Sequence, residues 1–288
     1  MDLIRFHPPA PALRPYVRCY AYRQVQPDAG TAISFPVPAR AVPMIEFCFD
    51  SSLRVQRFDR QDVIAPPRCV VIGLQTFRRV QLSMTGHYES FSILFQPAGI
   101  WQLFGAPMVE LANTEDDACA VLGHRLSVLG RMLQDSRSLE SRATIADRYL
   151  ASRLDGAATT GMAGAILELM RLNGNVSVDT LARQAGLGLR QFERRYKLMT
   201  GLRPKLHARI ARFEAALDAK ARIPAATWTE LAQRCGYHDQ MHLVHDFREF
   251  SSETPTHALT QLERAHGMHL NAIRQGLVRG RSDAPMIL

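Results

Sequence analysis

The chain has 288 residues, of which 47% are hydrophobic and 22% are charged, and its formal net charge is +8 at pH 7. This composition is ordinary for a soluble globular protein, and the length is sufficient for two domains with full cores. No apolar run reaches the roughly 18–20 residues that a membrane-spanning helix needs, and no secretory signal opens the chain. We therefore expect a cytoplasmic protein without membrane contact. The excess of basic residues falls mostly in residues 164–288.

The five cysteines are odd in number and scattered, and no two of them form a Cys-x-x-Cys pair. Reduced thiols in a cytosolic protein therefore fit better than a disulfide framework. A redox or methyl-acceptor sensor stays open as an alternative, although the sequence marks no low-pKa thiol. The cysteines are Cys19, Cys48, Cys69, Cys119 and Cys235.

Residues 1–110 are expected to form mostly strands. Short apolar runs, such as Met44–Phe49, Cys69–Leu74 and Phe91–Phe95, are bounded by proline, glycine and aspartate. This is the pattern of strands joined by turns. Spacing of this kind predicts a small antiparallel sandwich or barrel.

The pattern becomes helical from Thr114. This threonine can cap a helix whose first turn contains Glu115, Asp116 and Asp117, where the helix dipole favours negative charge. A second helix is expected over about 139–154. The two helices can pack on the strands or pair with another subunit, and the sequence leaves both open.

Changes in composition divide the chain into four segments. Residues 152–164 are small, glycine-bearing and weakly periodic, which is typical of a linker. The end of the chain has no clear core periodicity. We predict a β-rich sensory or dimerisation domain over 1–153, a linker over 154–163, a second domain over 164–265 and a tail over 266–288.

One unit occurs twice between residues 176 and 255: a short helix, a glycine turn, a second helix and then a proline. Each copy has the form of a helix-turn-helix. Two such units on one short stretch can contact two successive turns of a DNA major groove. The doubled unit therefore predicts a sequence-specific transcription regulator.

In the first copy, Ser177 stands where an N-cap belongs, and Gly186 permits the sharp turn because glycine adopts positive φ without Cβ strain. The second helix is expected from about Leu189 to Gly201, and Pro204 starts the helix that joins the two copies. The second helix should bury Leu189, Phe192, Tyr196 and Met199 and expose Arg190, Arg194 and Lys197 on its opposite face.

The second copy repeats this plan. Thr227 and Glu230 form a Thr-x-x-Glu capping box, Gly236 is the turn, and Asp239 caps the following helix. Pro255 begins the last helix, as Pro204 does after the first copy. The helix capped by Asp239 should bury Leu243, Phe247 and Phe250.

Residues 165–265 resemble the DNA-binding domain of AraC/XylS-type transcription regulators. The resemblance rests on the segments LARQAGLGLRQFERRYKLMTGLRP and LAQRCGYHDQMHLVHDFREFSSETP. The N-terminal part resembles, more loosely, the cupin-like sensory regions found in that family. The fold class implied is α+β, with a β-rich cupin-like N-terminal domain and trailing helices, followed by an all-α domain with two helix-turn-helix units.

The resemblance also implies which residues touch DNA. Arginine can pair bidentately with guanine and glutamine with adenine, whereas phosphate contacts position the protein without specifying sequence. Base-reading positions fall on Arg190, Gln191, Glu193 and Arg194 in the first copy and on Gln240, Met241, Val244 and His245 in the second. Phosphate contacts are expected at Lys197, Lys205, Arg209 and Arg248.

The chain departs from the family pattern at three places. Gly188-Leu189 replaces the usual Ser-Pro at the start of the first reading helix, and glycine is a tolerable cap. Met241 replaces a serine, so contact there would be apolar, for example with a thymine methyl group. Ser252 replaces the usual glycine before the second proline. These changes leave the target sequence open.

Three other interpretations stay open. Cys235, His238, His242 and His245 have the residue types of a zinc site, although Cys235 belongs to a buried stripe and His245 to a reading position. His87 could serve a metal-dependent N-terminal enzyme, although few histidines accompany it. Finally, the paired helices could serve protein contacts alone.

These observations together predict a regulator that is not an enzyme and that holds neither a cofactor nor a metal. Its C-terminal domain should bind promoter DNA in response to a signal sensed by the N-terminal domain. The expected partners are double-stranded DNA and RNA polymerase, while a small-molecule effector and a homodimer are left open.

Overall fold

The computed structural model describes residues 2–28, 30–154 and 161–263. The predicted tail over 266–288 lies outside these ranges, and so does most of the predicted linker. Of that linker, residues 161–163 already belong to a helix, which begins at Gly161. Within the described ranges, no helix combines the length and apolar character needed to cross a membrane.

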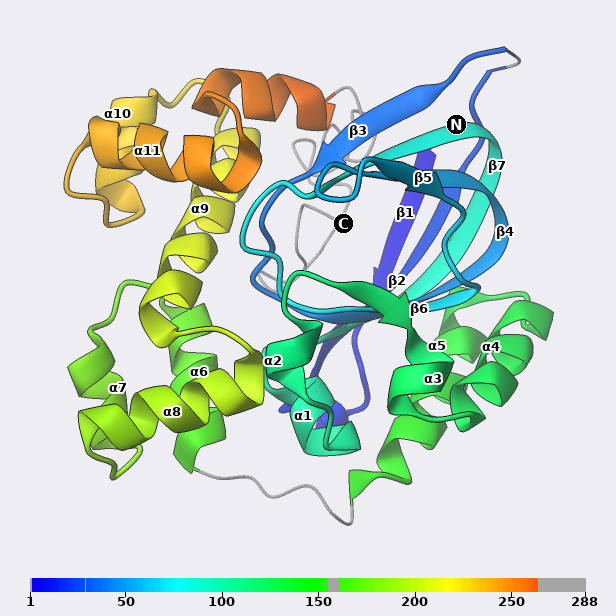
Figure 1. Ribbon diagram of the computed structural model, residues 1–288, viewed down its shortest axis with the longest axis horizontal. Helices are drawn as coiled ribbons and strands as arrows, with labels where there is room; N and C mark the ends of the chain where they lie inside the picture. Colours follow the sequence, from blue (N-terminus) through cyan, green and yellow to red (C-terminus); the bar gives the residue numbers. More distant parts are fainter. Residues whose placement is uncertain (1, 29, 155–160, 264–288) are drawn as a thin grey trace.

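The N-terminal half is built on one antiparallel sheet, which curves strongly (Figure 1). The strand order is β1-β2-β7-β4-β6-β8, with β3 beside β7 and β5 beside β4. Two of the three apolar runs expected to be strands lie in β4 and β7, and the third, Cys69–Leu74, forms β6 over its first four residues, so strands form where they were expected. The strands are β1 (Asp2–His7), β2 (Val17–Val25), β3 (Ile33–Val37), β4 (Met44–Arg57), β5 (Asp62–Ile64), β6 (Cys69–Ile72), β7 (Val80–Phe95) and β8 (Glu115–Asp117).

The predicted start of a helix at Thr114 is wrong. Residues Glu115–Asp117 form strand β8, which pairs with β6. Helix α3 (Ala118–Leu122) begins only after Asp117, whose carboxylate accepts hydrogen bonds from two backbone N–H groups of the first turn. The three acidic residues therefore close an edge of the sheet, and only the last of them caps a helix.

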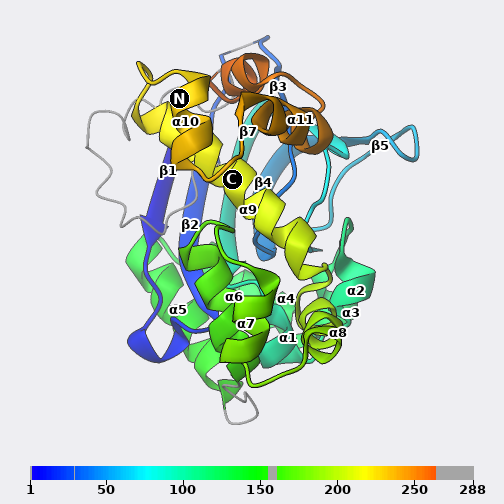
Figure 2. The same cartoon turned by 90° about the vertical axis from the view of Figure 1, so that its left-hand side faces the viewer.

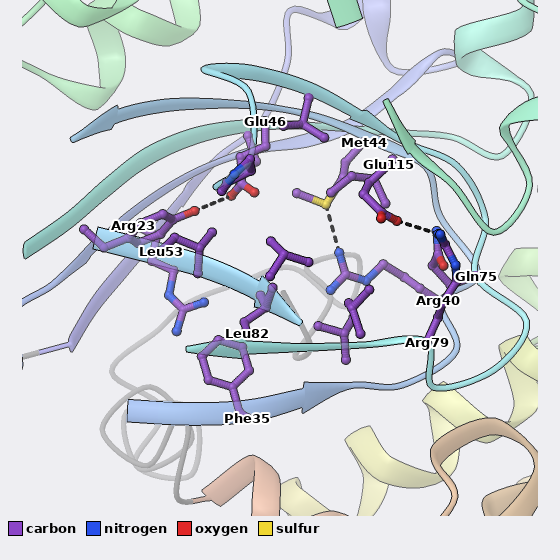
Figure 3. A pocket seen from close by; sticks show the side chains of 18 of the residues that line it. Arg23, Phe35, Arg40, Met44, Glu46, Leu53, Gln75, Arg79, Leu82 and Glu115 are labelled. Carbon is purple, nitrogen blue, oxygen red and sulfur yellow. Dashed lines mark hydrogen bonds and ion pairs between the residues drawn. The ribbon is translucent and has the colours of Figure 1, made fainter. Parts of the chain in front are cut away.

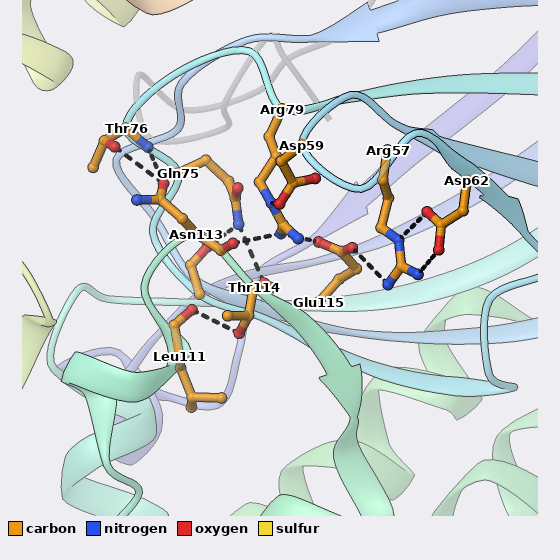
Figure 4. A network of polar contacts seen from close by, with 11 residues as sticks. Arg57, Asp59, Asp62, Gln75, Thr76, Arg79, Leu111, Asn113, Thr114 and Glu115 are labelled. Atoms are coloured by element: carbon orange, nitrogen blue, oxygen red, sulfur yellow. Dashed lines mark hydrogen bonds and ion pairs between the residues drawn. The ribbon is translucent and has the colours of Figure 1, made fainter.

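A network of polar contacts explains why this acidic segment is extended (Figure 4). Arg79 is buried and its guanidinium lies 2.6 Å from Glu115 Oε2 and 2.9 Å from Asp59 Oδ2. The Asn113 side chain accepts a hydrogen bond from the backbone N–H of Thr76 at 2.7 Å. These contacts tie the segment before β8 to the segment before β7, which a local helix could not do.

Five helices cover one end of the sheet (Figure 1). Residues such as Leu126, Leu133 and Leu150 are buried with Phe47 and Phe91 of the sheet in one core. The helix expected over 139–154 is α5, and it packs within the chain. The helices are α1 (Gly99–Phe104), α2 (Met108–Leu111), α3, α4 (Arg125–Asp135) and α5 (Leu139–Ala151).

The C-terminal half is entirely helical in the described residues. In Figure 2, α9 runs as a single connector between α6–α8 at one end and α10–α11 at the other. Residues 255–263 are helical as well and begin at the expected proline. The overall α+β fold class is thus confirmed. The helices are α6 (Gly161–Arg171), α7 (Val178–Gln184), α8 (Leu189–Thr200), α9 (Pro204–Arg222), α10 (Trp228–Arg234) and α11 (Gln240–Ser251).

The two halves are packed against each other. Ala39, Ala41, Leu74 and Ala98 of the N-terminal half are buried in the same hydrophobic core as the C-terminal helices. Across this contact, Arg78 also pairs with Glu253 at 3.1 Å. The two halves therefore share a hydrophobic core and are joined by an ion pair.

Candidate nucleic-acid interface

The first helix-turn-helix unit is α7 and α8. Ser177 Oγ accepts the backbone N–H of Thr180 at 3.1 Å and so caps α7. The turn passes through Gly186, whose φ is +67°, and the C-cap of α8 is Gly201, with φ +85°. Both angles lie in the left-handed region that favours glycine. The predicted cap, turn and helix bounds are confirmed.

The second unit is α10 and α11. Thr227 and Glu230 form the predicted capping box, with the Thr227 backbone N–H donating to Glu230 Oε2 at 2.7 Å. Asp239 Oδ1 accepts the backbone N–H of His242 at 2.8 Å and caps α11. The C-cap of α11 is Ser252, which takes φ +61° at the place where the family usually has glycine.

The buried faces of α8 and α11 hold both units on the connector α9. Phe192, Tyr196 and Met199 of α8 are buried as expected, but Leu189 is 44% exposed, so its predicted burial is wrong. Leu189 is the first residue of α8, and the helix enters the core only from the next turn. On α11, Leu243, Phe247 and Phe250 are fully buried, and the rings of the two phenylalanines lie 4.8 and 5.6 Å from that of Phe213 on α9.

The predicted base-reading side chains of α8 share one exposed surface. Within the described part of the chain they form no hydrogen bond or ion pair, so their polar groups are available to a ligand. They project from the first two turns of the helix, which are the turns that a major-groove helix presents to base edges. The residues are Arg190, Gln191, Glu193 and Arg194.

The predicted base-reading side chains of α11 differ in how far they are exposed. Gln240, Met241 and His245 are exposed, while Val244 is half-buried. Met241 is 71% exposed, the largest exposed fraction among the exposed large hydrophobic residues described. Gln240 Oε1 accepts a hydrogen bond from Thr229 Oγ1 at 2.6 Å, which leaves its amide N–H groups to donate.

Three of the four predicted phosphate-binding residues, Lys197, Lys205 and Arg248, are exposed. Arg209 differs from them because it is partly buried between α9 and α11. Its guanidinium Nη2 donates to Asp246 Oδ1 at 2.6 Å and to Glu249 Oε2 at 2.5 Å. Sequence reasoning missed the two carboxylates, although their spacing on one helix face is visible in the sequence.

The four residues considered as a zinc site are not brought together. His238 and His242 lie beside Asp239, with their Nδ1 atoms 3.2 and 3.3 Å from its carboxylate oxygens. Neither group of potential metal ligands found among the described residues includes Cys235, which is buried and whose pKa is raised by that burial. The donor set of the zinc hypothesis therefore does not fit the geometry.

The comparison with known protein families agrees with this geometry. Residues 181–261 match the family described as a helix-turn-helix domain, and residues 5–117 match a domain of unknown function, DUF6597. No curated protein matches the chain. Among solved structures, an apo variant of ToxT from Vibrio cholerae is 9% identical, covers 88% of this chain and 99% of its own, and gives a TM-score of 0.47.

Two further solved structures are similar. Wild-type ToxT from Vibrio cholerae with a bound unsaturated fatty acid is 11% identical, covers 84% of this chain and 95% of its own, and has a TM-score of 0.46. The DNA-binding domain of AdpA in complex with a target DNA is 24% identical over 36% of this chain and 95% of its own, with a TM-score of 0.33.

Two capped helix-turn-helix units on one connecting helix, each with an exposed second helix, define a DNA-binding transcription regulator. The C-terminal half carries a helix-turn-helix domain of the AraC type, over residues 181–261. We therefore call α8 and α11 the recognition helices.

Proposed function

We propose that this regulator binds promoter DNA sequence-specifically, with residues 164–265 as the DNA-binding domain and both recognition helices in the major groove. The observation that carries the proposal is the exposed polar face of α8. Its arginines, Arg190 and Arg194, have no protein partner within the described residues. Arginine in this setting pairs bidentately with guanine.

The remaining contacts divide by chemistry. Gln240 and His245 supply polar groups at the start and middle of α11, and Met241 supplies an apolar one. We assign phosphate contacts to Lys197, Lys205 and Arg248, which are exposed, and such contacts make affinity fall steeply with salt. Arg209 orients α11 through Asp246 and Glu249 and reaches a phosphate only if it releases one of them.

We further propose that residues 1–153 sense a small molecule, for which the inside of the curved sheet offers a cavity (Figure 3). The space open to the centres of water-sized molecules is about 90 Å³, which corresponds to several waters or a small organic molecule. Aliphatic side chains such as Leu53, Val55 and Leu82 line it together with polar groups. Cavities of this mixed lining are typical ligand sites.

Footprinting of the full-length protein on its own genome, followed by affinity measurements at several salt concentrations, tests the DNA-binding proposal. We expect discrete protected sites and an affinity that falls steeply with salt. The double variant R190A/R194A should lose the preference for those sites, whereas R68A, which removes an exposed arginine just before β6, should keep it. Equal affinity of the wild type for all duplexes would refute the proposal.

A further inference from the structure

Arg40 is a buried cation with no adequate partner. Its side chain lines the cavity and is only 6% exposed. Of its guanidinium donors, Nη1 contacts the thioether sulfur of Met44 at 2.9 Å, and Nε has no partner within the described residues. A thioether is a weak acceptor, and an unpaired buried charge is costly. Figure 3 shows the Arg40 guanidinium directed into the cavity toward Met44.

The carboxylates nearby are committed elsewhere. Glu46 Oε1 accepts hydrogen bonds from the hydroxyl groups of Tyr88, Ser90 and Ser92, at 2.9, 3.1 and 3.2 Å. Glu214 Oε1 accepts the backbone N–H of Ala41 at 2.9 Å. Both act on Arg40 only through space, and desolvation lowers the pKa of Arg40 in spite of them.

The charges of the cavity lining favour a monoanion. Three arginines, Arg23, Arg40 and Arg79, face two glutamates, Glu46 and Glu115. Arg79 is neutralised by its ion pair with Glu115. The two other arginines then face one glutamate, which leaves an excess of one positive charge in the lining. The remaining lining is mainly aliphatic, so the complementary molecule carries one negative group on an apolar body. A carboxylate matches the planar guanidinium with two parallel hydrogen bonds.

The segment that carries Arg40 also holds the DNA-binding helices. On one side of Arg40, the Ala39 N–H donates to the carbonyl of Phe250, near the end of α11, at 2.8 Å. On the other side, the Ala41 N–H donates to Glu214 of α9. The Ala41 carbonyl accepts from His207 Nε2, also of α9, at 2.8 Å.

The last of these contacts extends to the first recognition helix. Because a carbonyl can only accept, His207 carries its proton on Nε2, and its Nδ1 accepts from the hydroxyl of Tyr196 on α8 at 2.7 Å. Residues 39–41 are thus linked to α8, α9 and α11, while the side chain of the middle residue lines the cavity. A ligand that binds Arg40 therefore acts on a segment that is hydrogen-bonded to α9 and α11 directly and to α8 through His207.

We propose that the cavity binds a small organic carboxylate through Arg40, and that residues 39–41 transmit its binding to both recognition helices. The proposal rests on the signal-sensing function proposed above and names its ligand class and its route to DNA. Binding at Arg40 and DNA affinity are coupled reciprocally, as in any allosteric pair.

Ligand class is tested on the full-length protein by calorimetry and thermal unfolding with hexanoate and benzoate, and with hexanamide and benzamide as neutral equivalents. We expect the acids to bind and to raise the melting temperature, and the amides to bind at least tenfold more weakly. R40Q should lose the preference for acids, whereas R68Q, at an exposed arginine, should retain it.

A second variant keeps this test independent of folding failure. R40M replaces the unpaired buried cation by an apolar chain, which is expected to leave the ligand-free protein as stable as the wild type or more stable. A purely structural Arg40 would instead make R40M less stable. The ligand class would be overturned by a lower stability of R40M, by equal binding of acids and amides, or by the absence of acid binding to the wild type.

Transmission is tested by measuring affinity for a footprinted promoter fragment with and without hexanoate or benzoate. We expect a change of at least about fivefold, the lower end of typical allosteric coupling. Y196F removes the hydroxyl that links His207 to α8, so it should keep acid binding and reduce the change in affinity. Y149F, on α5, should leave both intact. Acid binding that leaves DNA affinity unchanged would overturn the route, whereas loss of DNA binding by the free protein would refute the proposed function itself.

Discussion

Arg209 of α9 bridges Asp246 and Glu249 of α11, with Nη2 lying 2.6 Å from Asp246 Oδ1. The guanidinium also lies 5.0 Å from the ring centroid of Phe250, so it is held by a charge pair and by an aromatic face. Asp246 is itself buried. This side chain therefore helps to hold the second recognition helix on the connector, together with the packing of Phe247 and Phe250 on Phe213.

Replacing Arg209 by alanine leaves the buried Asp246 without its cation. We expect R209A to lower the free energy of unfolding by about 2 kcal/mol, between the values for exposed and for fully buried ion pairs. Urea unfolding measures this loss, with R195A as the control because Arg195 is an exposed arginine of α8. Unchanged stability of R209A would show that the ion pair with Asp246 does not stabilise the fold, and Arg209 would then be interpreted as a phosphate contact only.

Arg194 and Lys205 should differ in what they contribute to DNA binding. R194A is expected to relax discrimination at one or two base pairs, at a cost of about 1–3 kcal/mol on the preferred sequence, since base contacts specify. K205A is expected to weaken all duplexes alike and to reduce the salt dependence. Competition binding with single-base variants of the site separates the two. Uniform losses in both variants would mean that the reading face is assigned wrongly.

Met241 is expected to contact a thymine methyl group, because its side chain is 71% exposed at the start of α11 and cannot donate a hydrogen bond. Replacing the contacted thymine by uracil removes one methyl group and should cost about 1 kcal/mol of binding. M241A should cost a similar amount on thymine DNA and nothing further on uracil DNA. Additive losses would show that the two groups do not touch.

Local signals made the helix-turn-helix units predictable. The caps and turns act within a few residues of their own position, so the sequence predicts their roles. They are Ser177, Thr227, Asp239 and the two turn glycines. Three strands of the N-terminal half followed from the apolar runs in the same way. These features depend on neighbours along the chain, which the sequence places directly.

Contacts between distant residues were not predictable in this way. The acidic residues after Thr114 satisfy every local rule for a helix start, yet they pair with β6 because Arg79 lies opposite Glu115. Leu189 has the period of a buried residue but precedes the part of α8 that reaches the core. The Arg40 segment has no motif at all, since its partners lie on helices far along the chain.

His207 should make stability fall in mild acid. Burial lowers its pKa from 6.5 to about 4, so between these values the unfolded chain binds a proton that the folded chain excludes. Its contribution is complete above pH 6.5 and is lost as the pH falls toward 4, by about 3 kcal/mol in all. The raised pKa of buried Glu214 acts in the opposite direction, so the comparison must be made between variants. H207Q should flatten the pH dependence of unfolding relative to the wild type, and parallel curves would contradict the assignment.

Gly201 and Gly188 flank α8 and should respond oppositely to a side chain. A Cβ on Gly201 would lie 2.3 Å from the carbonyl oxygen of Met108, and its φ of +85° disfavours any other residue. G201A should therefore cost at least about 2 kcal/mol and loosen α8 from α2. Gly188 has φ −69° and open space around its Cβ position, so G188S adds a better N-cap and should stabilise α8 by a few tenths of a kcal/mol. Chemical unfolding of both variants gives the two values directly, and a G201A protein as stable as the wild type would show that α8 does not rest on α2 in solution.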